Sequence, residues 1–178
     1  MTDFASGALR LLAWSRIWSP LVPEEWREDA WQALELPGSW SQVEAAFWPT
    51  FHVGLPAPRV PLLLHAALGR DGGQAREDWL RVASHLGLTF GEHTLPPDHL
   101  GIACELLACA LRDEEDVLVR ELCSRYLRPW CEWARARLAA EEGPLAALPA
   151  VFEADLRCVA AARADAPHSP DSRHAASR

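Results

Sequence analysis

The sequence predicts an all-α protein, a single-domain helical bundle of about seven to nine helices. Apolar residues make up 49% of the 178 positions, and leucine, alanine and nine tryptophans supply most of them. β-branched residues are scarce and almost never alternate with polar ones, which disfavours strands. Apolar residues recur instead at the spacing of a helix face, and a chain of this length can bury one substantial core.

Proline and acidic residues mark the first two helices. Apolar positions recur at helical spacing over residues 3–18, and Pro20 stops the pattern. A second helix begins at Pro23, where two glutamates follow at the positive end of the helix dipole. Pro37 and Gly38 predict the end of this helix.

A short helix and an extended connector are expected next. Ser41 and Glu44 have the spacing of a capping box and predict the start of a third helix. Residues 52–61 contain three prolines, which predicts an extended connector before the apolar run 62–68. A glycine-rich turn at 69–73 then leads into a helix that ends before Gly87, and a polar loop covers 89–97.

The carboxy-terminal half is predicted to hold three helices and a tail. Two long helices fit residues 98–112 and 114–140, the second interrupted at Pro129, which lacks a backbone donor. The last helix fits residues 149–163. The remaining residues include no large apolar side chain and cannot offset the entropy cost of ordering. The predicted organisation is a helical domain and a disordered tail, residues 1–163 and 164–178.

The charge of the chain excludes several classes of function. The formal net charge is −8, which repels nucleic acid phosphates and attracts cationic partners. All 17 basic residues are arginine, so the chain has neither a Schiff-base lysine nor a P-loop lysine.

Cysteine usage and the amino terminus predict a cytoplasmic protein that does not engage a membrane. The five cysteines include no CxxC pair and lie in helical apolar patterns, which is typical of free thiols in a reducing compartment. Residues 1–20 have no basic cluster before their apolar positions, and the longest apolar run is far shorter than a membrane span.

The most distinctive stretch is LPPDHL at residues 95–100, where two prolines lead into a helix whose first turn contains Asp98 and His99. A small and polar stripe continues along that otherwise apolar helix, at Gly101, Glu105, Ala108 and Arg112. Such a stripe faces either water or a ligand groove. An acid–base pair of Asp98 and His99 is disfavoured, because neighbours on a helix point about 100° apart.

Metal and cofactor sites have weaker signals. His85, His93 and His99 precede Cys104 at separations that match neither HExxH nor paired CxxC ligands, so no metal site is predicted. The glycine-rich run 69–73 follows an apolar helix and lacks lysine, so it is a poor phosphate loop. Five residues could stack a nucleotide or a pterin, namely Arg125, Tyr126, Arg128, Trp130 and Trp133. Trp130 also falls on a core stripe with Leu127, Ala134 and Leu138, and the core is the favoured interpretation for it. No cofactor is predicted.

Three segments share a further pattern. Residues 9–20, LRLLAWSRIWSP, form an apolar helix that ends in aromatic-Ser-Pro. The segment REDWLRVASHLGL at 76–88 leads to LPPDHLGIACELLACAL at 95–111, and RYLRPWCEWARARL at 125–138 contains a Leu-x-x-Trp helix. In these segments the chain resembles the TorD/DmsD/NarJ family of redox-enzyme maturation chaperones, over residues 9–140. It is most similar to the chaperones of type II dimethyl sulfoxide reductase family enzymes.

This resemblance implies a cytoplasmic chaperone that is not an enzyme. Its partner would be the signal segment on the catalytic subunit of a molybdenum-dependent oxidoreductase, held back from twin-arginine export until the cofactor is inserted. Molybdenum cofactor biosynthesis proteins would be further partners. Asp98 and His99 match the family's Glu-Pro-x-Asp-His motif and would take its peptide-recognition role, whereas Leu95 stands in place of the Glu. An acidic protein with an apolar groove could hold such a segment, with Glu105 on the acidic side.

Two other classes of function stay open from the residues alone. One is a generic helical protein-interaction domain, and the other is a small enzyme that uses Asp98 and His99. The identity of the client enzyme, the binding of a guanine nucleotide, and the choice between a monomer and a domain-swapped dimer are not determined by the sequence.

Overall fold

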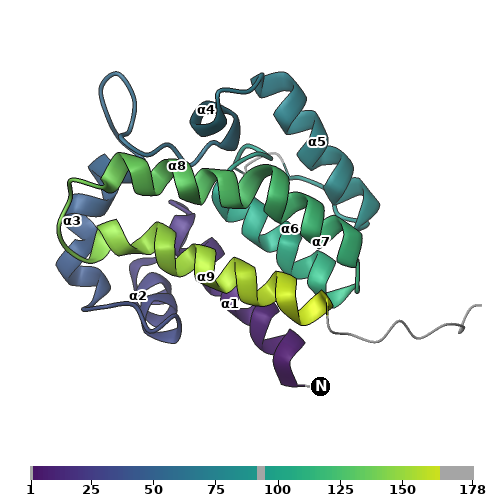
Figure 1. Ribbon diagram of the computed structural model, residues 1–178. Coiled ribbons are helices and arrows are strands. Elements are labelled where there is room, and N and C mark those ends of the chain that lie inside the picture. Colours follow the sequence, from purple (N-terminus) through teal and green to yellow (C-terminus); the bar gives the residue numbers. More distant parts are fainter. Residues whose placement is uncertain (1, 92–94, 165–178) are drawn as a thin grey trace, which may run out of the picture.

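The computed structural model describes residues 2–91 and 95–164, and within them it confirms the all-α prediction (Figure 1). The described chain forms nine α-helices and one π-helical segment: α1 (Thr2–Trp18), α2 (Glu24–Ala33), α3 (Trp40–Phe51), α4 (Leu64–Leu68), α5 (Gly72–His85), α6 (Leu100–Arg112), α7 (Asp116–Leu122), η1 (Cys123–Leu127), α8 (Arg128–Leu138) and α9 (Pro144–Ala164). None of the described helices combines the length and the apolar composition needed to cross a lipid bilayer.

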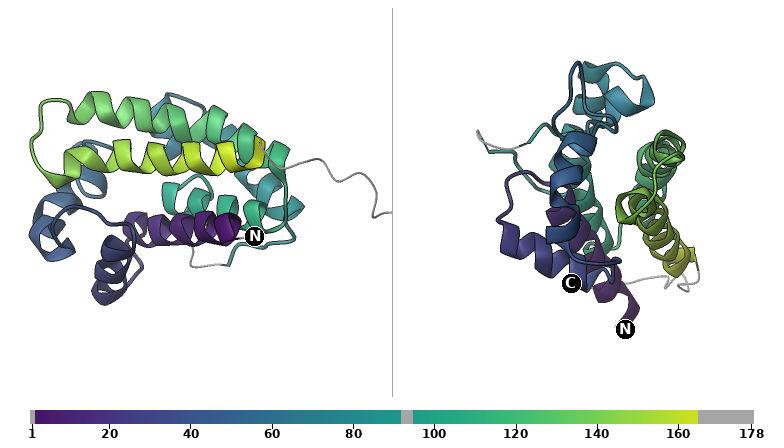
Figure 2. Two further views of the ribbon diagram at one scale, coloured as in Figure 1. Left: turned by 60° about the horizontal axis from the view of Figure 1, so that its bottom comes forward. Right: turned by 90° about the vertical axis from the view of Figure 1, so that its left-hand side faces the viewer.

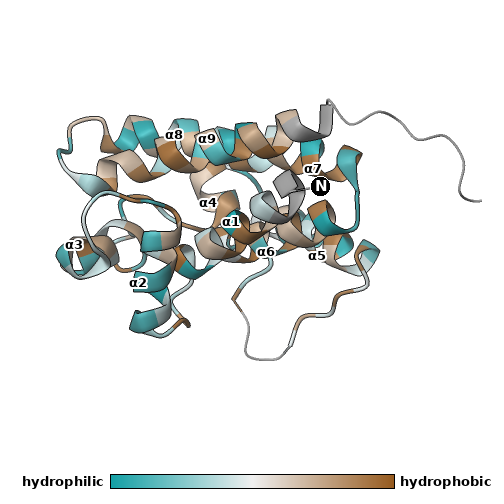
Figure 3. Cartoon of the chain, turned by 90° about the horizontal axis from the view of Figure 1, so that it is seen from below, coloured by the Kyte–Doolittle hydropathy of each residue, from teal (hydrophilic) through white to brown (hydrophobic). Residues whose placement is uncertain are grey.

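The helices form two layers. α8 and α9 run antiparallel as a long hairpin, which packs over a layer that contains α1 and α6 (Figure 2). α2 and α3 close one end of the molecule, and α4 with α5 lies across the outer side of α6 and α8. Hydrophobic residues recur along α1, α6, α8 and α9, the helices that enclose the core (Figure 3). The core therefore lies between the hairpin and the α1–α6 layer.

An aromatic cluster fills the centre of this core. The fully buried Trp18 of α1 stacks on Trp14 with ring centroids 5.3 Å apart. Its ring also meets Phe51 of α3 and Trp130 of α8, each at 5.5 Å, and Phe152 of α9 at 5.9 Å. Aromatic pairs at these separations stabilise beyond their buried area. One side chain thus joins four helices that are distant in the sequence.

The second helix ends earlier than predicted. α2 stops at Ala33, not at Pro37, and Glu35 adopts a left-handed φ of 56°. The backbone N–H of Leu36 then donates to the carbonyl of Trp31 at 3.1 Å. These are the features of a Schellman motif, which usually has glycine at the left-handed position. Burial of Leu36 against the core accounts for this ending, which a search for Gly or Pro cannot find.

The predicted capping box of the third helix was placed two residues too late. α3 begins at Trp40, and the backbone N–H of Ser39 donates to the side-chain oxygen of Gln42 at 3.1 Å. The box is therefore Ser39 with Gln42, not Ser41 with Glu44. Trp40 is fully buried, so the helix starts where an aromatic anchor enters the core.

The interruption predicted at Pro129 is a π-helical segment. The backbone N–H of Arg128 donates to the carbonyl of Cys123, five residues earlier. Because Pro129 has no N–H, the carbonyl of Arg125 is free to accept a hydrogen bond from the Arg70 guanidinium at 2.9 Å. The local irregularity of one helix therefore creates an attachment point for the turn before α5.

The last helix begins one turn and a half before its predicted start. α9 starts at Pro144 and contains Pro149, the residue predicted to begin it. Pro144 and Pro149 are both suitable first residues of a helix. The helix begins at Pro144 because Leu148, which precedes Pro149, is fully buried and belongs to the packed face of α9. Of the predicted disordered tail, residues 165–178 lie outside the described residues.

Candidate functional site

The LPPDHL stretch lies between α4 and α6 and is held there by backbone pairing. The N–H of Leu64 donates to the carbonyl of Asp98 at 3.0 Å, and the N–H of Leu100 donates to the carbonyl of Leu62 at 2.8 Å. These bonds flank an isolated antiparallel bridge between Leu63 and His99. The position of Asp98 is therefore set by a segment more than thirty residues earlier in the chain.

Asp98 is completely buried and joins α4 to α5. Its Oδ2 accepts from Nδ1 of His65 at 2.5 Å and from the backbone N–H of His65 at 3.3 Å. Its Oδ1 accepts from Nε of Arg76 at 3.3 Å. A buried carboxylate is stabilised by such donors. We call Asp98, His65 and Arg76 the Asp98 clasp.

The placement of Asp98 in the first turn of its own helix was wrong. α6 begins at Leu100, and His99 is its N-cap residue. Asp98 precedes the cap and instead accepts from the first turn of α4. A negative charge is favourable at the amino terminus of a helix. The Asp98 carboxylate lies at the amino terminus of α4 and not at that of α6, its neighbour in the sequence.

His99 starts α6 as a neutral imidazole. The backbone N–H of Gly101 donates to Nδ1 of His99 at 3.1 Å, so this nitrogen is unprotonated. Burial and, to a smaller extent, the neighbouring His52 lower the pKa of His99 to about 4, although Asp98 acts to raise it. The His52 ring stacks on the His99 ring at 6.2 Å, and the pKa of His52 is also lowered to about 4, by burial and by Arg27. Both rings are uncharged at neutral pH.

The polar stripe on α6 packs mainly against α1, so its expected exposure to water or to a groove was wrong for two of the residues. Gly101 and Ala108 are buried, and a Cβ atom on Gly101 would lie 3.3 Å from the carbonyl oxygen of Ser15. Small residues let two helices approach closely. Arg112 is exposed and pairs with Asp113 at 2.7 Å.

Glu105 is the exposed carboxylate of the stripe. It accepts a hydrogen bond from the Ser15 hydroxyl of α1 at 2.6 Å. Asp98 and His99 are adjacent in the chain, but their side chains bond different partners, and the hydrogen bond of Glu105 goes to α1. Among the three residues predicted to bind a signal segment, Glu105 is therefore the one with a solvent-accessible side chain.

The Asp98–His65 pair joins the LPPDHL stretch to the first turn of α4. An aspartate that orients a histidine is a common feature of general-base sites. Here, however, the Nε2 side of the His65 ring packs against the first turn of α5, since a Cβ atom on Gly72 would lie 3.2 Å from Nε2. Sequence reasoning found Asp98 but missed His65, because no local spacing connects residues 33 positions apart.

Large apolar side chains are exposed on α1, on α2 and in the turn between them. Leu9 and Leu12 of α1 are 66% and 40% exposed, and Leu21 and Trp26 are 65% and 51% exposed. We call these four residues the α1–α2 apolar face. The guanidinium of Arg16 lies over the Trp26 ring at 5.4 Å and connects the two helices. Leu12 lies one turn from Ser15, the partner of Glu105, so the apolar face borders an acid.

The glycine-rich run 69–73 and the segment that contains Arg125 and Tyr126 were considered above for phosphate and nucleotide binding. Residues of both line one cavity of about 290 Å³. It is lined by residues from the start of α5 and from η1, namely Arg70, Asp71, Gln74, Ala75, Asp78, Arg125 and Tyr126. The Arg70 guanidinium lies 4.7 Å from the Tyr126 ring centroid, and the Tyr126 hydroxyl donates to Asp78 at 2.6 Å. These polar groups bond one another. Trp130 is buried in the core and donates to the carbonyl of Pro61 at 3.0 Å.

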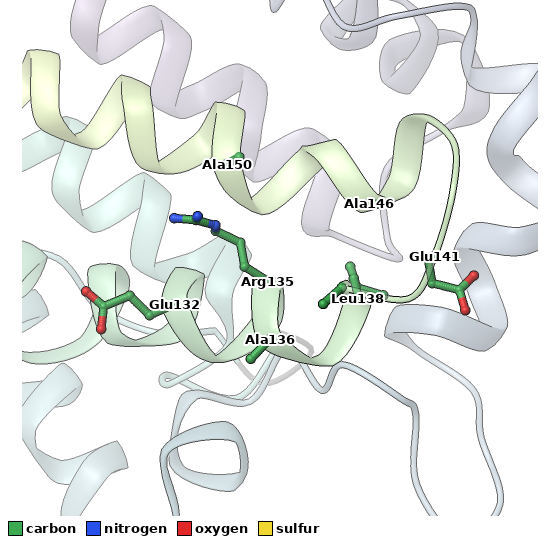
Figure 4. Close-up of a pocket in the computed structure, with 8 residues that line it drawn as sticks. Glu132, Arg135, Ala136, Leu138, Glu141, Ala146 and Ala150 are labelled. Carbon is green, nitrogen blue, oxygen red and sulfur yellow. The ribbon is translucent and has the colours of Figure 1, made fainter.

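A larger, open groove of about 630 Å³ lies between α8 and α9. Its small side chains come from both helices, and Arg135 extends from α8 towards Ala150 of α9 (Figure 4). Arg135 pairs with the buried Glu153 at 2.9 Å. Glu132 and Glu141 lie towards the two ends of the groove. The groove thus has a small-residue floor and an acidic rim.

Within residues 2–91 and 95–164, no three His, Cys, Asp or Glu side chains are grouped so that they could hold a metal ion. His85 lies 3.3 Å from Glu115, Cys104 is buried in the core, and His93 lies outside the described residues. No protein-family model matches the chain, and no match was found among curated proteins or solved structures.

Proposed function

We propose that this protein is a cytoplasmic chaperone that binds the signal segment of a molybdoenzyme catalytic subunit and assists cofactor insertion before twin-arginine export. It acts as a binding protein and not as an enzyme. Molybdenum cofactor biosynthesis proteins are its further partners in this role. The proposal joins the resemblance of residues 9–140 to one surface of the molecule.

The observation that supports the proposal is an acidic group beside exposed apolar side chains. Glu105 bonds to Ser15 on α1, one helical turn from Leu12. A twin-arginine signal combines a cationic head with an apolar stretch. The apolar stretch would cover the α1–α2 apolar face, and an arginine would pair with Glu105.

The acidic start of α2 adds to the charge complementarity of this surface. Glu24 and Glu25 are exposed in the first turn of α2, next to Trp26. The chain as a whole has a net charge of −8, which favours a cationic segment over an anionic one. Charge of this kind raises the rate of encounter and selects between partners more than it raises affinity.

Asp98 and His99 act as positioning residues in this proposal. Asp98 is fully buried and His99 is 6% exposed, so neither offers a free surface to a peptide. His99 accepts from Gly101 in the first turn of α6, the helix that presents Glu105 two turns later, and Asp98 ties the residue before this cap to α4 and α5. The LPPDHL motif would therefore govern peptide recognition through the placement of α6.

Fluorescence anisotropy with a labelled signal peptide tests the proposal. The peptide has two adjacent arginines before an apolar stretch, and its control has glutamine at both positions. We expect the arginine peptide to bind more tightly and to lose this preference at high salt, because exposed charges are screened. Equal affinity for both peptides at low salt would refute the proposal.

Two glutamate variants locate the site. Glu105→Gln is expected to weaken binding of the arginine peptide by about fivefold, equivalent to about 1 kcal/mol for one exposed charge pair. Glu121→Gln removes the same charge from an exposed position of α7 and is expected to leave affinity unchanged. If both variants bind like the unaltered protein, Glu105 is not a contact.

A further inference from the structure

A short apolar loop projects from the molecule between α3 and α4 (Figure 1). We call residues 53–57 the finger. Val53 is 68% exposed and Leu55 is fully exposed, and Pro56 and Ala57 at the same tip are exposed as well. Contiguous exposed apolar residues on a soluble domain mark a contact surface. The finger contains no charged residue, in a chain with a net charge of −8.

The finger is held in a defined shape. The N–H of Val60 donates to the carbonyl of Thr50 at 2.8 Å and closes the base of the loop. The N–H of Val53 donates to the carbonyl of Trp48 at 2.9 Å. At the tip, a Cβ atom on Gly54 would lie only 2.3 Å from the carbonyl oxygen of Ala57, so the turn admits glycine alone. A loop closed in this way binds with little ordering cost.

The α8–α9 groove lies at the base of the finger. Arg59, two residues beyond the finger, forms an ion pair with Glu141, which lines the groove (Figure 4). Leu138 and Glu141 also line a second cavity of about 160 Å³, which reaches Val43 and Ala46 of α3. The two cavities therefore adjoin at Leu138 and Glu141, and we call them together the trough.

The trough has the size and surface to accept apolar side chains. Ala136, Ala139 and Ala150 are exposed within it, and Leu138 forms part of its floor. Its rim carries Glu132, Glu141 and Glu142. The uncharged finger adds no like charge to this rim.

We propose that the finger of one copy of this chain docks in the α8–α9 groove of a second copy, and that the second finger docks in the first groove. A two-fold dimer needs each contact to be made twice by the same pair of surfaces. The Arg59–Glu141 ion pair places the base of the finger beside the groove, so the two docking parts belong to one continuous region of the surface. Leu55 then occupies the alanine-lined part of the trough.

The size of the contact predicts a weak dimer. A five-residue finger and a shallow groove bury less than the roughly 1,200 Å² total of a standard stable interface, even when the contact is made twice. The dimer is therefore expected in the micromolar range and not at the lowest concentrations. This inference does not rest on the chaperone proposal, because the finger and the groove are distinct from Glu105 and the α1–α2 apolar face.

Sedimentation equilibrium over a range of concentrations tests the dimer. The unaltered chain is expected to pass from monomer to dimer as concentration rises. Leu55→Asp and Ala150→Glu put a charge on the finger and in the groove, and each is expected to weaken dimerisation at least tenfold. Val117→Asp puts the same charge on another exposed apolar position, 64% exposed on α7, and is expected to dimerise like the unaltered chain.

All the substituted side chains are exposed, so thermal melting should show that the variants fold normally. A chain that stays monomeric at the highest soluble concentration would overturn the proposal. Dimerisation unchanged by Leu55→Asp would also overturn it, because another surface would then form the dimer. Loss of dimer with Leu55→Asp but not with Ala150→Glu would remove the groove as the acceptor.

Discussion

The aromatic core around Trp18 and the Asp98 clasp both join helices that are distant in the sequence, but they do so by different physics. Trp18 meets rings from α1, α3, α8 and α9 through non-directional packing. Asp98 meets α4 and α5 through three directional hydrogen bonds. Packing energy is spread over many contacts, whereas the clasp depends on single atoms at defined positions.

This difference predicts different responses to substitution and to pH. Loss of a core ring removes buried area and leaves a cavity, with little dependence on pH. Loss of the Asp98 carboxylate leaves the part-buried donors of His65 and Arg76 without an acceptor. The histidines beside the clasp add a pH dependence that the aromatic core lacks. Four predictions follow from the comparison, in order of expected effect.

Trp18→Ala is expected to have the largest effect, a loss of about 4 kcal/mol in the free energy of unfolding. The indole is fully buried and contacts four helices. Urea unfolding followed by circular dichroism measures the loss. Trp26→Ala is the matched control, since Trp26 is 51% exposed, and should cost less than about 1 kcal/mol. Similar losses for the two variants would contradict the central place of Trp18.

Asp98→Ala is expected to lower the free energy of unfolding by about 3 kcal/mol. The substitution leaves Nδ1 of His65 and the first turn of α4 without their acceptor. Asp98→Asn keeps one acceptor oxygen and should cost less. Asp29→Ala, at an exposed position of α2, should stay within about 0.5 kcal/mol of the unaltered protein. A loss for Asp98→Ala no greater than that of Asp29→Ala would show that the clasp contributes little.

Acid should destabilise the protein through His99. The pKa of His99 is lowered from 6.5 to about 4 by burial and by His52, so the unfolded chain binds the proton first as pH falls. Stability is therefore lost between pH 6.5 and pH 4, by about 2 kcal/mol at pH 5 for this one residue. His99→Asn keeps a capping side chain but cannot titrate.

Urea unfolding of the unaltered protein and of His99→Asn, at pH 7 and at pH 5, measures this difference. The variant should lose about 2 kcal/mol less than the unaltered protein between the two pH values. Equal losses in the two proteins would show that the imidazole of His99 is protonated as readily in the folded chain as in the unfolded chain.

Glycine at two helix ends should give the smallest effect, and it should be stabilising. Glu35 and Glu114 have φ values of 56° and 60°, which glycine adopts without steric cost. Glu35→Gly and Glu114→Gly should each raise the free energy of unfolding by about 0.5–1 kcal/mol, seen as a higher melting temperature. Glu77→Gly, inside α5, should lower it by about 1 kcal/mol. If Glu35→Gly lowers the free energy of unfolding instead, the contacts of the Glu35 side chain stabilise the protein by more than its left-handed backbone costs.

Much of the helical fold could be predicted from local patterns. The α1 helix follows its apolar spacing, and Pro129 predicted an interruption of the helix expected over residues 114–140, where η1 lies. The ends of α2 and α3 were misplaced, because burial of Leu36 and of Trp40 decided them and not the nearest Gly, Pro or Ser. Helix ends are settled by which side chains reach the core, which a short window of sequence does not contain.

The candidate site was only partly predictable. The two prolines before Asp98 singled out the segment, and the resemblance singled out Asp98 and His99. The sequence could not supply His65 or His52, which reach the site from α4 and from the end of α3. It also could not show that Gly101 and Ala108 are buried while Glu105 is exposed and bonds Ser15 of α1.

The sequence by itself determined the helical class, the buried stripe of most helices and the acidic net charge, because each depends on composition or on neighbours within about four positions. Three pairings were decided by the tertiary structure alone. Asp98 bonds His65 and Arg76, and Glu105 borders the α1–α2 apolar face. The finger lies beside the α8–α9 groove. These pairings join residues 22 to 90 positions apart. Such contacts form only when whole helices have packed, so no local periodicity encodes them.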